Sequence, residues 1–188
     1  MKKKIILASN SPRRRELLSG LDIDFETRVI DGIAESYPIG LKSADVPEYI
    51  AREKAEAYNV ASNEILVTAD TVVELDGKIF GKPHDEEEAK RMLHELSGKT
   101  HHVITGVCLT TSDDKRSFSV STSVTFKDFT NDEIDYYVNR YKPLDKAGAY
   151  GIQEWIGYIG CKGLEGSYYN VMGLPVQRIY EELKKMCQ

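Results

Sequence analysis

The chain has 188 residues, of which 41% are apolar, and its formal net charge at pH 7 is −5. This size and composition fit one globular unit with a hydrophobic core, so we expect a single domain over residues 1–188. The negative charge argues against a nucleic-acid coat protein, which needs a basic face to neutralise phosphates. No apolar run approaches the roughly 20 residues of a membrane span.

The three cysteines are Cys108, Cys161 and Cys187. Their number is odd and they form no CxxC pair, so neither a disulfide framework nor a zinc site is predicted. The apolar run at 5–8 is shorter than the roughly 7–15 apolar residues of a signal peptide. We therefore expect a protein of the reduced cytoplasm that has neither a membrane nor a nucleic acid as its partner.

Strand and helix patterns alternate along the first half of the chain. Residues 5–9 form a short apolar strand. Ser11 can cap the helix that follows, Pro12 suits its first turn, and Gly20 is a natural residue just past its end. The next predicted elements are a strand at 25–30, a polar loop at 35–44, a helix at 45–58, a strand at 65–73 and a tight hairpin turn at Asp76-Gly77.

The alternation continues in the second half. Asp85 and the three glutamates after it predict a helix start, because acidic groups favour the positive N-terminal end of a helix. Thr130-x-x-Glu133 is a capping box that opens another helix. The remaining predicted elements are strands at 101–111, 117–127 and 152–159, a loop at 143–151, a glycine-rich stretch up to 173 and a terminal helix that Pro175 opens.

This order of elements predicts an α/β fold in which helices flank a sheet. Residues 72–80 and 101–127 contain strands joined by short turns. Such turns pair neighbouring strands in antiparallel fashion, so we expect a mixed sheet and not a purely parallel one.

The segment from Ser9 to Arg15 is the first with a chemical pattern. A strand leads into a turn and a helix starts at once, so free N–H groups and the helix macrodipole favour an anion there. Arg13, Arg14 and Arg15 add fork-shaped donors that suit phosphate oxygens. The alternative is an exposed basic first turn, although three cations at a helix N-terminus oppose the dipole. The residues alone leave both interpretations open.

Asp70 stands inside an apolar strand. An ionised carboxylate is costly there unless it is paired or bound to a metal, and such groups often mark functional sites. A carboxylate that caps a turn is the alternative. Lys82 lies in a rigid turn, and taken alone it reads as an ordinary surface lysine. Glu35 and Lys54 are likewise single residues of a kind more often solvated than functional, although Lys54 shares the largely inward face of its helix.

Two segments, 146–153 and 163–173, are rich in glycine. The first ends in Gln153 and by itself reads as a plain connecting loop. The second has neither the Walker lysine pattern nor GxGxxG, so the P-loop and Rossmann mechanisms do not apply.

Taken together, these segments resemble the Maf family of nucleotide pyrophosphatases. The matching motifs follow the family order over nearly the whole chain, namely SNSPRR at 9–14 with Leu17-Leu18, ADTVV at 69–73, GKP at 81–83, LSGKTH at 96–101, VITGV at 103–107, KAGAYGIQ at 146–153 and GSYYNVMGLP at 166–175. The resemblance implies an elongated mixed sheet flanked by helices, as in the inosine triphosphate pyrophosphatases, with the active site in a deep cleft. Family members are often dimers, and a homodimer is one oligomeric state that the resemblance allows.

The resemblance also implies an activity. Family members hydrolyse a nucleoside triphosphate to the monophosphate and pyrophosphate with a divalent metal, Mg²⁺ or Mn²⁺. The subfamily that acts on dTTP and UTP carries an arginine, a threonine and a glutamine at the positions of Arg13, Thr71 and Gln153, which favours these substrates here. In one departure, Glu154 stands where members often have glycine, and a side chain there could reshape the rim of the base pocket.

The resemblance assigns roles to Asp70, Arg13, Thr71 and Gln153, and the need to neutralise the charge of a triphosphate suggests roles for five further residues. Asp70 would take the proton from the attacking water. The other roles are substrate specificity for Arg13, Thr71 and Gln153, phosphate binding for Ser9, Arg14, Lys54 and Lys82, and metal binding for Asp70 and Glu35.

The Gln153 amide offers both a donor and an acceptor, which match the N–H and carbonyl of uracil or thymine. A flipped amide would match cytosine, so a second group must fix its orientation, and Thr71 is the candidate.

Two alternatives remain open. The same chemistry could act on 7-methyl-GTP, a modified pyrimidine triphosphate or inosine triphosphate. A regulator of septum formation that senses triphosphates without hydrolysing them is the alternative outside the enzyme class. The presence of Asp70 together with Arg13 and Lys82 favours an enzyme, because a sensor needs no general base. The sequence does not separate a cellular role in removing non-standard nucleotides from one in division arrest.

Overall fold

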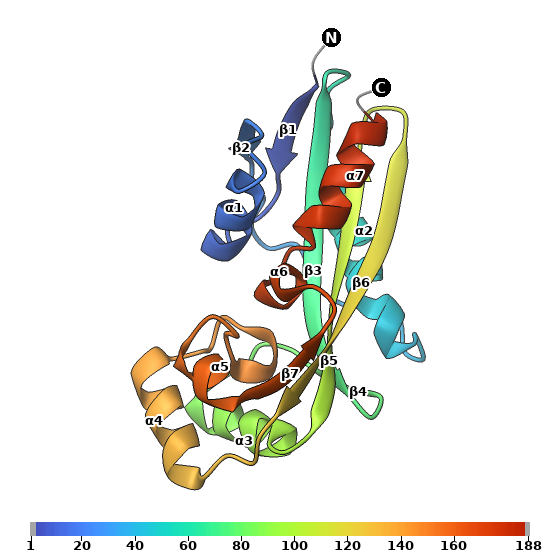
Figure 1. Cartoon of the computed structure of the whole chain (residues 1–188). Coiled ribbons are helices and arrows are strands. Elements are labelled where there is room, and N and C mark those ends of the chain that lie inside the picture. Colours follow the sequence, from blue (N-terminus) through green and yellow to red (C-terminus); the bar gives the residue numbers. More distant parts are fainter. Residues whose placement is uncertain (1–2, 187–188) are drawn as a thin grey trace. The chain divides into compact units, whose positions relative to one another are not determined.

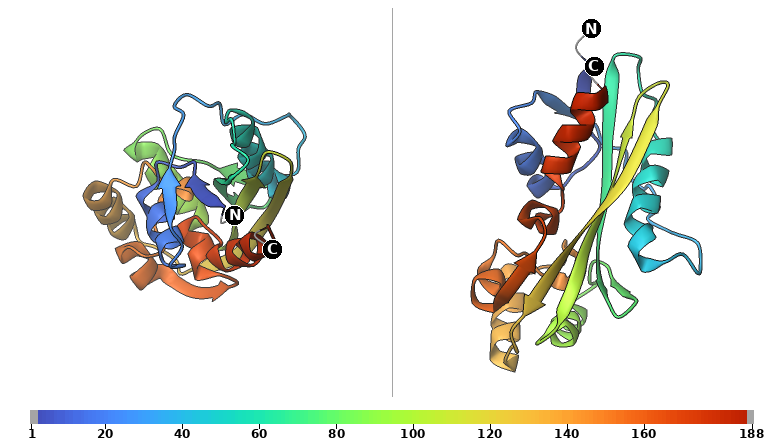
Figure 2. Two further views of the ribbon diagram at one scale, coloured as in Figure 1. Left: turned by 90° about the horizontal axis from the view of Figure 1, so that it is seen from above. Right: turned by 45° about the vertical axis from the view of Figure 1, so that its right-hand side comes forward.

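The computed structural model describes residues 3–186 and has an α/β fold (Figures 1 and 2). Its strands are β1 (Lys4–Leu7), β2 (Phe25–Thr27), β3 (Glu64–Leu75), β4 (Lys78–Phe80), β5 (Thr100–Thr110), β6 (Lys115–Phe126) and β7 (Cys161–Glu165). Its α-helices are α1 (Pro12–Ser19), α2 (Val46–Glu56), α3 (Glu86–Leu96), α4 (Asn131–Tyr141), α5 (Trp155–Gly160), α6 (Tyr168–Met172) and α7 (Val176–Met186), and its 3₁₀-helices are η1 (Ser43–Asp45) and η2 (Ala147–Ala149).

The sheet is mixed, as predicted. Its strand order is β2-β1-β3-β5-β6-β7, and β4 pairs with β3 outside this path. Strand β1 runs parallel to both β2 and β3. By contrast, β4 is antiparallel to β3, and β7 is antiparallel to β6.

The described residues divide into two compact units. The first contains residues 3–70, Thr105–Val120 and 173–186, and the second contains Thr71–Ile104 and Ser121–Met172. Strands β3, β5 and β6 contribute residues to both units. The expectation of a single domain over residues 1–188 stays a prediction.

In the first unit, α2 and α7 cover opposite faces of the sheet (Figures 1 and 2). On the α2 side, Ala51 and Ala55 pack in a buried cluster with Ile6 of β1 and Leu66 of β3. On the other side, α7 is fixed to β6 by the Arg178 guanidinium, which lies 5.3 Å from the centre of the Phe118 ring. Both faces are thus covered, which suits the nearly continuous apolar sequence of β3.

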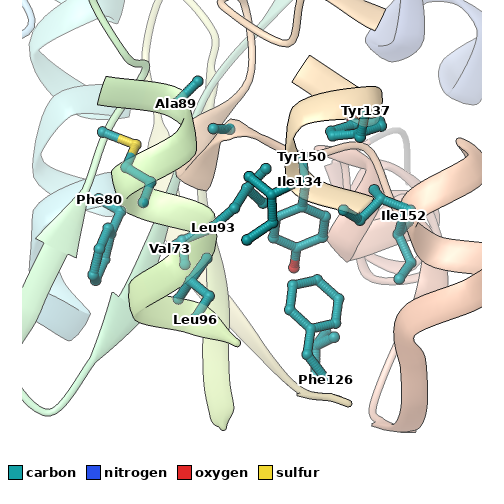
Figure 3. Close-up of a cluster of buried hydrophobic side chains, with 14 of the residues drawn as sticks. Val73, Phe80, Ala89, Leu93, Leu96, Phe126, Ile134, Tyr137, Tyr150 and Ile152 are labelled. Carbon is teal, nitrogen blue, oxygen red and sulfur yellow. The ribbon is translucent and has the colours of Figure 1, made fainter. Parts of the chain in front are cut away.

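The second unit has a hydrophobic core of its own (Figure 3). Helix α3 packs against α4 and η2, and Tyr150, Phe126 and Ile134 are buried among side chains of these elements. The Tyr150 hydroxyl lies 2.7 Å from His101 Nε2. Burial lowers the pKa of His101 from 6.5 to about 4, so this imidazole is neutral near pH 7 and belongs to the core.

The predicted helix starts and the hairpin turn are confirmed. Ser11 caps α1, Asp85 caps α3, and Thr130 forms a complete capping box with Glu133 at the start of α4. In the turn between β3 and β4, Asp76-Gly77 has φ values of 52° and 83°. Positive φ at both central residues is what a two-residue hairpin turn of type I′ requires.

The predicted strand at 152–159 is wrong. Residues Trp155–Gly160 form α5, and the strand follows at Cys161–Glu165 as β7. The isoleucines and aromatic residues have strand propensity, but Ile156 and Gly160 are buried at a helical spacing of four. A Cβ on Gly157 would lie 1.8 Å from the Ile152 carbonyl oxygen, so this glycine allows the chain to turn tightly into the helix.

No helix within residues 3–186 is long and apolar enough to cross a membrane.

Gly106 provides a test of how α2 packs on the sheet. A Cβ at this position in β5 would lie 2.1 Å from the Glu48 nitrogen and 2.2 Å from the Pro47 carbonyl carbon. Gly106→Ala should therefore lower the free energy of unfolding by about 1–3 kcal/mol or more, measured by urea denaturation. Gly163→Ala on β7 is the control, because its Cβ meets nothing closer than 3.9 Å. Equal stability of the two variants would contradict this packing.

Candidate active site

The start of α1 fixes the basic segment in the first unit. Buried Ser9 accepts a hydrogen bond from the Ser11 N–H at 3.2 Å, and Ser11 Oγ accepts one from the Arg14 N–H at 3.4 Å. Arg13 is half-buried in the first turn of the helix, whereas Arg15 is exposed. The segment is thus ordered by its own polar groups, and Arg15 is the arginine of the three that faces solvent.

Arg14 ties the start of α1 to two other parts of the first unit. Its Nε donates to the Gly173 carbonyl at 2.8 Å, and its Nη1 donates to the Ala69 carbonyl at 3.1 Å. Burial lowers the pKa of this guanidinium from its ordinary value, and the charge on Asp70 opposes that shift. The structure therefore holds a positive charge near Asp70 through backbone carbonyls.

Lys54 pairs with both predicted metal-binding carboxylates. Its Nζ lies 2.9 Å from Asp70 Oδ1 and 2.7 Å from Glu35 Oε1. The side chains of Lys54 and Asp70 are only 14% and 11% exposed, whereas that of Glu35 is 44% exposed. The inward orientation expected of Lys54 is confirmed, and Asp70 is paired within the apolar strand.

The donor set for a divalent cation is small. Among residues 3–186, no group of three or more His, Cys, Asp or Glu side chains is placed to hold a metal ion. Asp70 and Glu35 do converge on one positive charge, that of Lys54. Mg²⁺ is commonly held by one or two carboxylates together with substrate phosphates and water. The residues present therefore fit a metal that arrives with a phosphate ligand, and they do not form a complete protein cage.

Thr71 and Lys82 belong to the second unit. Thr71 directly follows Asp70 on β3 and is half-buried, and the alternation of side chains along a strand points it away from the Asp70 face. Lys82 lies in the loop after β4, which is bound to η2 through the Gly148 N–H and the Gly81 carbonyl at 3.1 Å. That loop borders a cavity of about 370 Å³ lined by Lys78, Ile79, Phe80, Gly81, Lys82, His84, Glu88, Arg91, Met92 and Glu95.

Gln153 also belongs to the second unit. It lies in a turn closed by a hydrogen bond from the Glu154 N–H to the Gly151 carbonyl at 3.0 Å. Its Oε1 is buried and has no hydrogen-bond partner among the residues that the structure describes. A buried acceptor without a donor is costly, which distinguishes Gln153 from an ordinary residue of a connecting loop.

The family model described as Maf-like protein matches residues 4–186. The chain belongs to the Maf-like family.

Several relatives of this Maf-like chain carry one name. A Phocaeicola vulgatus protein is 62% identical over 98% of this chain and 97% of its own length, and a Parabacteroides distasonis protein is 60% identical over 97% and 96%. Both are called dTTP/UTP pyrophosphatase. The solved structure of a HAM1 protein from Coxiella burnetii covers 97% of this chain and 99% of its own, with 15% identity and a TM-score of 0.49.

The structure brings together one group of the residues predicted from the sequence. Lys54 contacts Asp70 and Glu35, while Arg14 contacts the Ala69 carbonyl, all within the first unit. Ser9 and Arg13 lie at the start of α1, in the same unit. The three predicted residues of the second unit are Thr71, Lys82 and Gln153. The functional roles of all nine residues stay predictions.

Sequence reasoning missed the partners of Glu154. This carboxylate accepts a hydrogen bond from the Tyr137 hydroxyl and pairs with Lys146 Nζ at 3.2 Å. Lys146 is buried, and a buried lysine needs a counter-charge. The sequence shows a lysine and a glutamate eight residues apart on an irregular loop, and no periodic pattern relates two such positions.

Lys54 offers a test of the charge balance in the first unit. Lys54→Met should lower the free energy of unfolding by about 3 kcal/mol, near the lower end of the cost of breaking a buried pair. Asp70→Asn in the same background should recover part of that loss, because a neutral amide needs no counter-charge. Both changes are measured by urea denaturation.

Lys4→Met is the matched control in the same unit. It removes a pair with Glu26 whose side chains are 43% and 60% exposed, and it should change stability by less than about 1 kcal/mol. Two results would contradict a buried ion pair between Lys54 and Asp70. One is a Lys54→Met variant that is no less stable than this control, and the other is a further loss of stability when Asp70→Asn is added to Lys54→Met.

Proposed function

We propose that this Maf-like protein is a nucleoside triphosphate pyrophosphatase that hydrolyses dTTP and UTP to the monophosphate and pyrophosphate. The observation that carries the proposal is the contact of Asp70 with Lys54 in the first unit, with the fixed charge of Arg14 near them. The names of relatives about 60% identical over nearly the whole chain support the same substrates. A nucleotide is the expected partner, and a cytoplasmic homodimer without a nucleic-acid partner stays a prediction.

The chemical problem is one of charge. A nucleoside triphosphate carries about four negative charges near pH 7, so cations must neutralise its oxygens before a nucleophile can approach. Arg13, Arg14 and Lys54 supply positive charge in the first unit, and Lys82 supplies it in the second. Donors fixed before the substrate arrives need no reorganisation during the reaction. Arg14 fits this requirement best, because backbone carbonyls hold its guanidinium.

Asp70 is the proposed general base. A water molecule attacks the α-phosphorus, Asp70 accepts the proton that the water loses, and pyrophosphate leaves with the electrons of the broken P–O bond. Lys54 donates to Asp70 Oδ1 at 2.9 Å, which holds the carboxylate in one orientation. A general base must lie within hydrogen-bond reach of the proton that it takes, so this orientation matters for the rate.

Asp70 and Glu35 are the residues that would hold a divalent cation. When bound, Mg²⁺ or Mn²⁺ would supply positive charge shared between these carboxylates and the phosphate oxygens. Glu35 lies in a loop and is more exposed than Asp70. Its position therefore suits a ligand that meets a metal arriving with the nucleotide.

Gln153 is the residue proposed to recognise the nucleobase. Uracil and thymine present an N–H beside a carbonyl, and the buried Gln153 Oε1 is an acceptor without a donor in residues 3–186. A site that leaves a buried polar group unpaired rejects a ligand that lacks the matching group. Thr71 and Arg13 keep their predicted part in specificity.

The decisive measurement is pyrophosphate release from a panel of nucleoside triphosphates with Mg²⁺ and with Mn²⁺, repeated with Asp70→Asn. The wild type should prefer dTTP and UTP to 7-methyl-GTP and inosine triphosphate. Asp70→Asn should bind nucleotide and lose about 10²–10⁴ in turnover, the usual contribution of a positioned general base. Asp113→Asn, an amide exchange at an exposed turn residue, should leave turnover unchanged.

Two outcomes would reverse these conclusions. Full turnover in a pure preparation of Asp70→Asn would exclude that residue as the base. Tight binding of dTTP by the wild type without any release of pyrophosphate would favour a nucleotide sensor over an enzyme.

Gln153→Glu tests how the base is selected. The carboxylate has no N–H donor, so the variant should have a lower ratio of kcat/KM for dTTP and UTP to kcat/KM for CTP. Its hydrolysis of the best substrate should fall by a much smaller factor. Ratios of kcat/KM across the nucleotide panel measure the change. Asn139→Asp, the same amide-to-acid exchange at an exposed position of α4, is the control. An unchanged order of substrates would exclude Gln153 from base selection.

A further inference from the structure

The turn that carries Gln153 is closed at both ends. Its closing hydrogen bond runs from the Glu154 N–H to the Gly151 carbonyl at 3.0 Å, so Gln153 is the third of its four residues. The backbone leaves the turn directly into α5, which starts at Trp155. The position of the Gln153 amide therefore depends on how firmly Gly151 and Glu154 are held.

Tyr137 of α4 binds both ends of this turn. Its hydroxyl accepts a hydrogen bond from the Gly151 N–H at 3.0 Å and donates one to Glu154 Oε2. Burial of the ring raises the pKa of Tyr137 well above its ordinary value, and the neighbouring charge of Glu154 raises it further. The hydroxyl thus keeps its proton, and one atom of a packed helix joins the first residue of the turn to the last.

Lys146 completes the arrangement. Its Nζ lies 3.2 Å from Glu154 Oε1 and 2.9 Å from Asp145 Oδ1. Each Glu154 oxygen therefore has its own donor, Lys146 for one and Tyr137 for the other. Gly151 packs closely against both side chains, since a Cβ at this position would be 3.0 Å from Glu154 Cδ and 3.1 Å from Lys146 Cε.

The Glu154 carboxylate does not cap α5. Glu154 is the residue just before this helix, and its side chain makes no capping hydrogen bond. Its contacts with Tyr137 and Lys146 turn the carboxylate toward α4 and the preceding loop.

We propose that Glu154 is a positioning residue for Gln153, and that with Tyr137 and Lys146 it fixes the turn so that the Gln153 amide selects among pyrimidine bases. This inference rests on the proposed function. A glutamine side chain has several torsions of its own, and its amide can pair with uracil in one orientation and with cytosine in the other. A fixed backbone limits where the amide lies, whereas a loose turn lets it meet either base.

The test compares the kcat/KM of UTP with that of CTP in Glu154→Ala, Tyr137→Phe and Glu154→Gln. A misplacement of about 1 Å can cost about 10²-fold in rate, so we expect Glu154→Ala to lower the UTP:CTP ratio by about tenfold. The fall should come mainly from KM for UTP. Tyr137→Phe should act in the same direction. Glu154→Gln should recover most of the ratio, because an amide oxygen can still accept from Tyr137. Glu165→Ala, at an exposed position of β7, should keep the wild-type ratio.

A second set of variants separates positioning from direct contact with the base. In a Gln153→Ala background, Glu154→Ala should cause no further loss of selectivity, because its effect passes through Gln153. A further loss would mean that Glu154 acts on the base directly, and would overturn the proposal. So would a Glu154→Ala variant that is less stable to urea but keeps the wild-type ratio, since that result describes a purely structural residue.

Failure of the proposed function would look different. If the wild type hydrolyses neither UTP nor CTP, both the proposed pyrophosphatase activity and this role of Glu154 are refuted. A wild type that prefers UTP, with the same preference in Glu154→Ala, would refute the positioning role alone.

Discussion

The candidate site depends on the ammonium group of Lys54. Strand β3 is apolar on both sides of Asp70, and the Asp70 side chain is only 11% exposed. An ionised carboxylate in that setting needs a partner that is itself held in place. Lys54 is that partner because it lies on the face of α2 that packs toward the sheet. The buried residues Ile50, Ala51 and Ala55 lie on the same face. The hydrophobic packing of α2 thereby determines where the charge of Lys54 lies.

The same constraint connects packing with the chemistry proposed for the first unit. Helix α2 can approach β5 closely because Gly106 has no side chain against Pro47 and Glu48. With α2 in this position, Lys54 Nζ lies 2.9 Å from Asp70 Oδ1 and 2.7 Å from Oε1 of the more exposed Glu35. The guanidinium of Arg14 lies near both carboxylates as well, and although burial lowers its pKa, the charges of Asp70 and Glu35 each raise it. Under the proposed function, a divalent cation that arrives with a phosphate ligand would add a further positive charge beside these carboxylates.

The elements of the fold could be predicted where a local signal determines them. Side-chain caps at Ser11, Asp85 and Thr130 identify helix starts, because they satisfy N–H groups within a few residues of themselves. The Asp76-Gly77 turn is equally local. The strand predicted at 152–159 is wrong because strand-forming side chains in this segment are buried at helical spacing. The close contact of Gly157 with Ile152, which lets the chain turn there, has no signature in composition.

The residues of the candidate site were easier to predict than their partners. Arginine, lysine and aspartate are charged wherever they occur in a motif, so the cations near Asp70 could be predicted from the sequence and the family resemblance. Their contacts depend on chain segments far apart, as in the bonds from Arg14 to the carbonyls of Ala69 and Gly173. Charge acts over several ångströms and tolerates small errors in position, whereas an amide that distinguishes two bases does not. In the role proposed for Gln153, selection of a nucleobase therefore requires a more rigid support than binding of phosphate, and Tyr137 contacts both Gly151 and Glu154 in the turn that carries this glutamine. On that proposal, the residues that decide selectivity include some that need never touch the nucleotide.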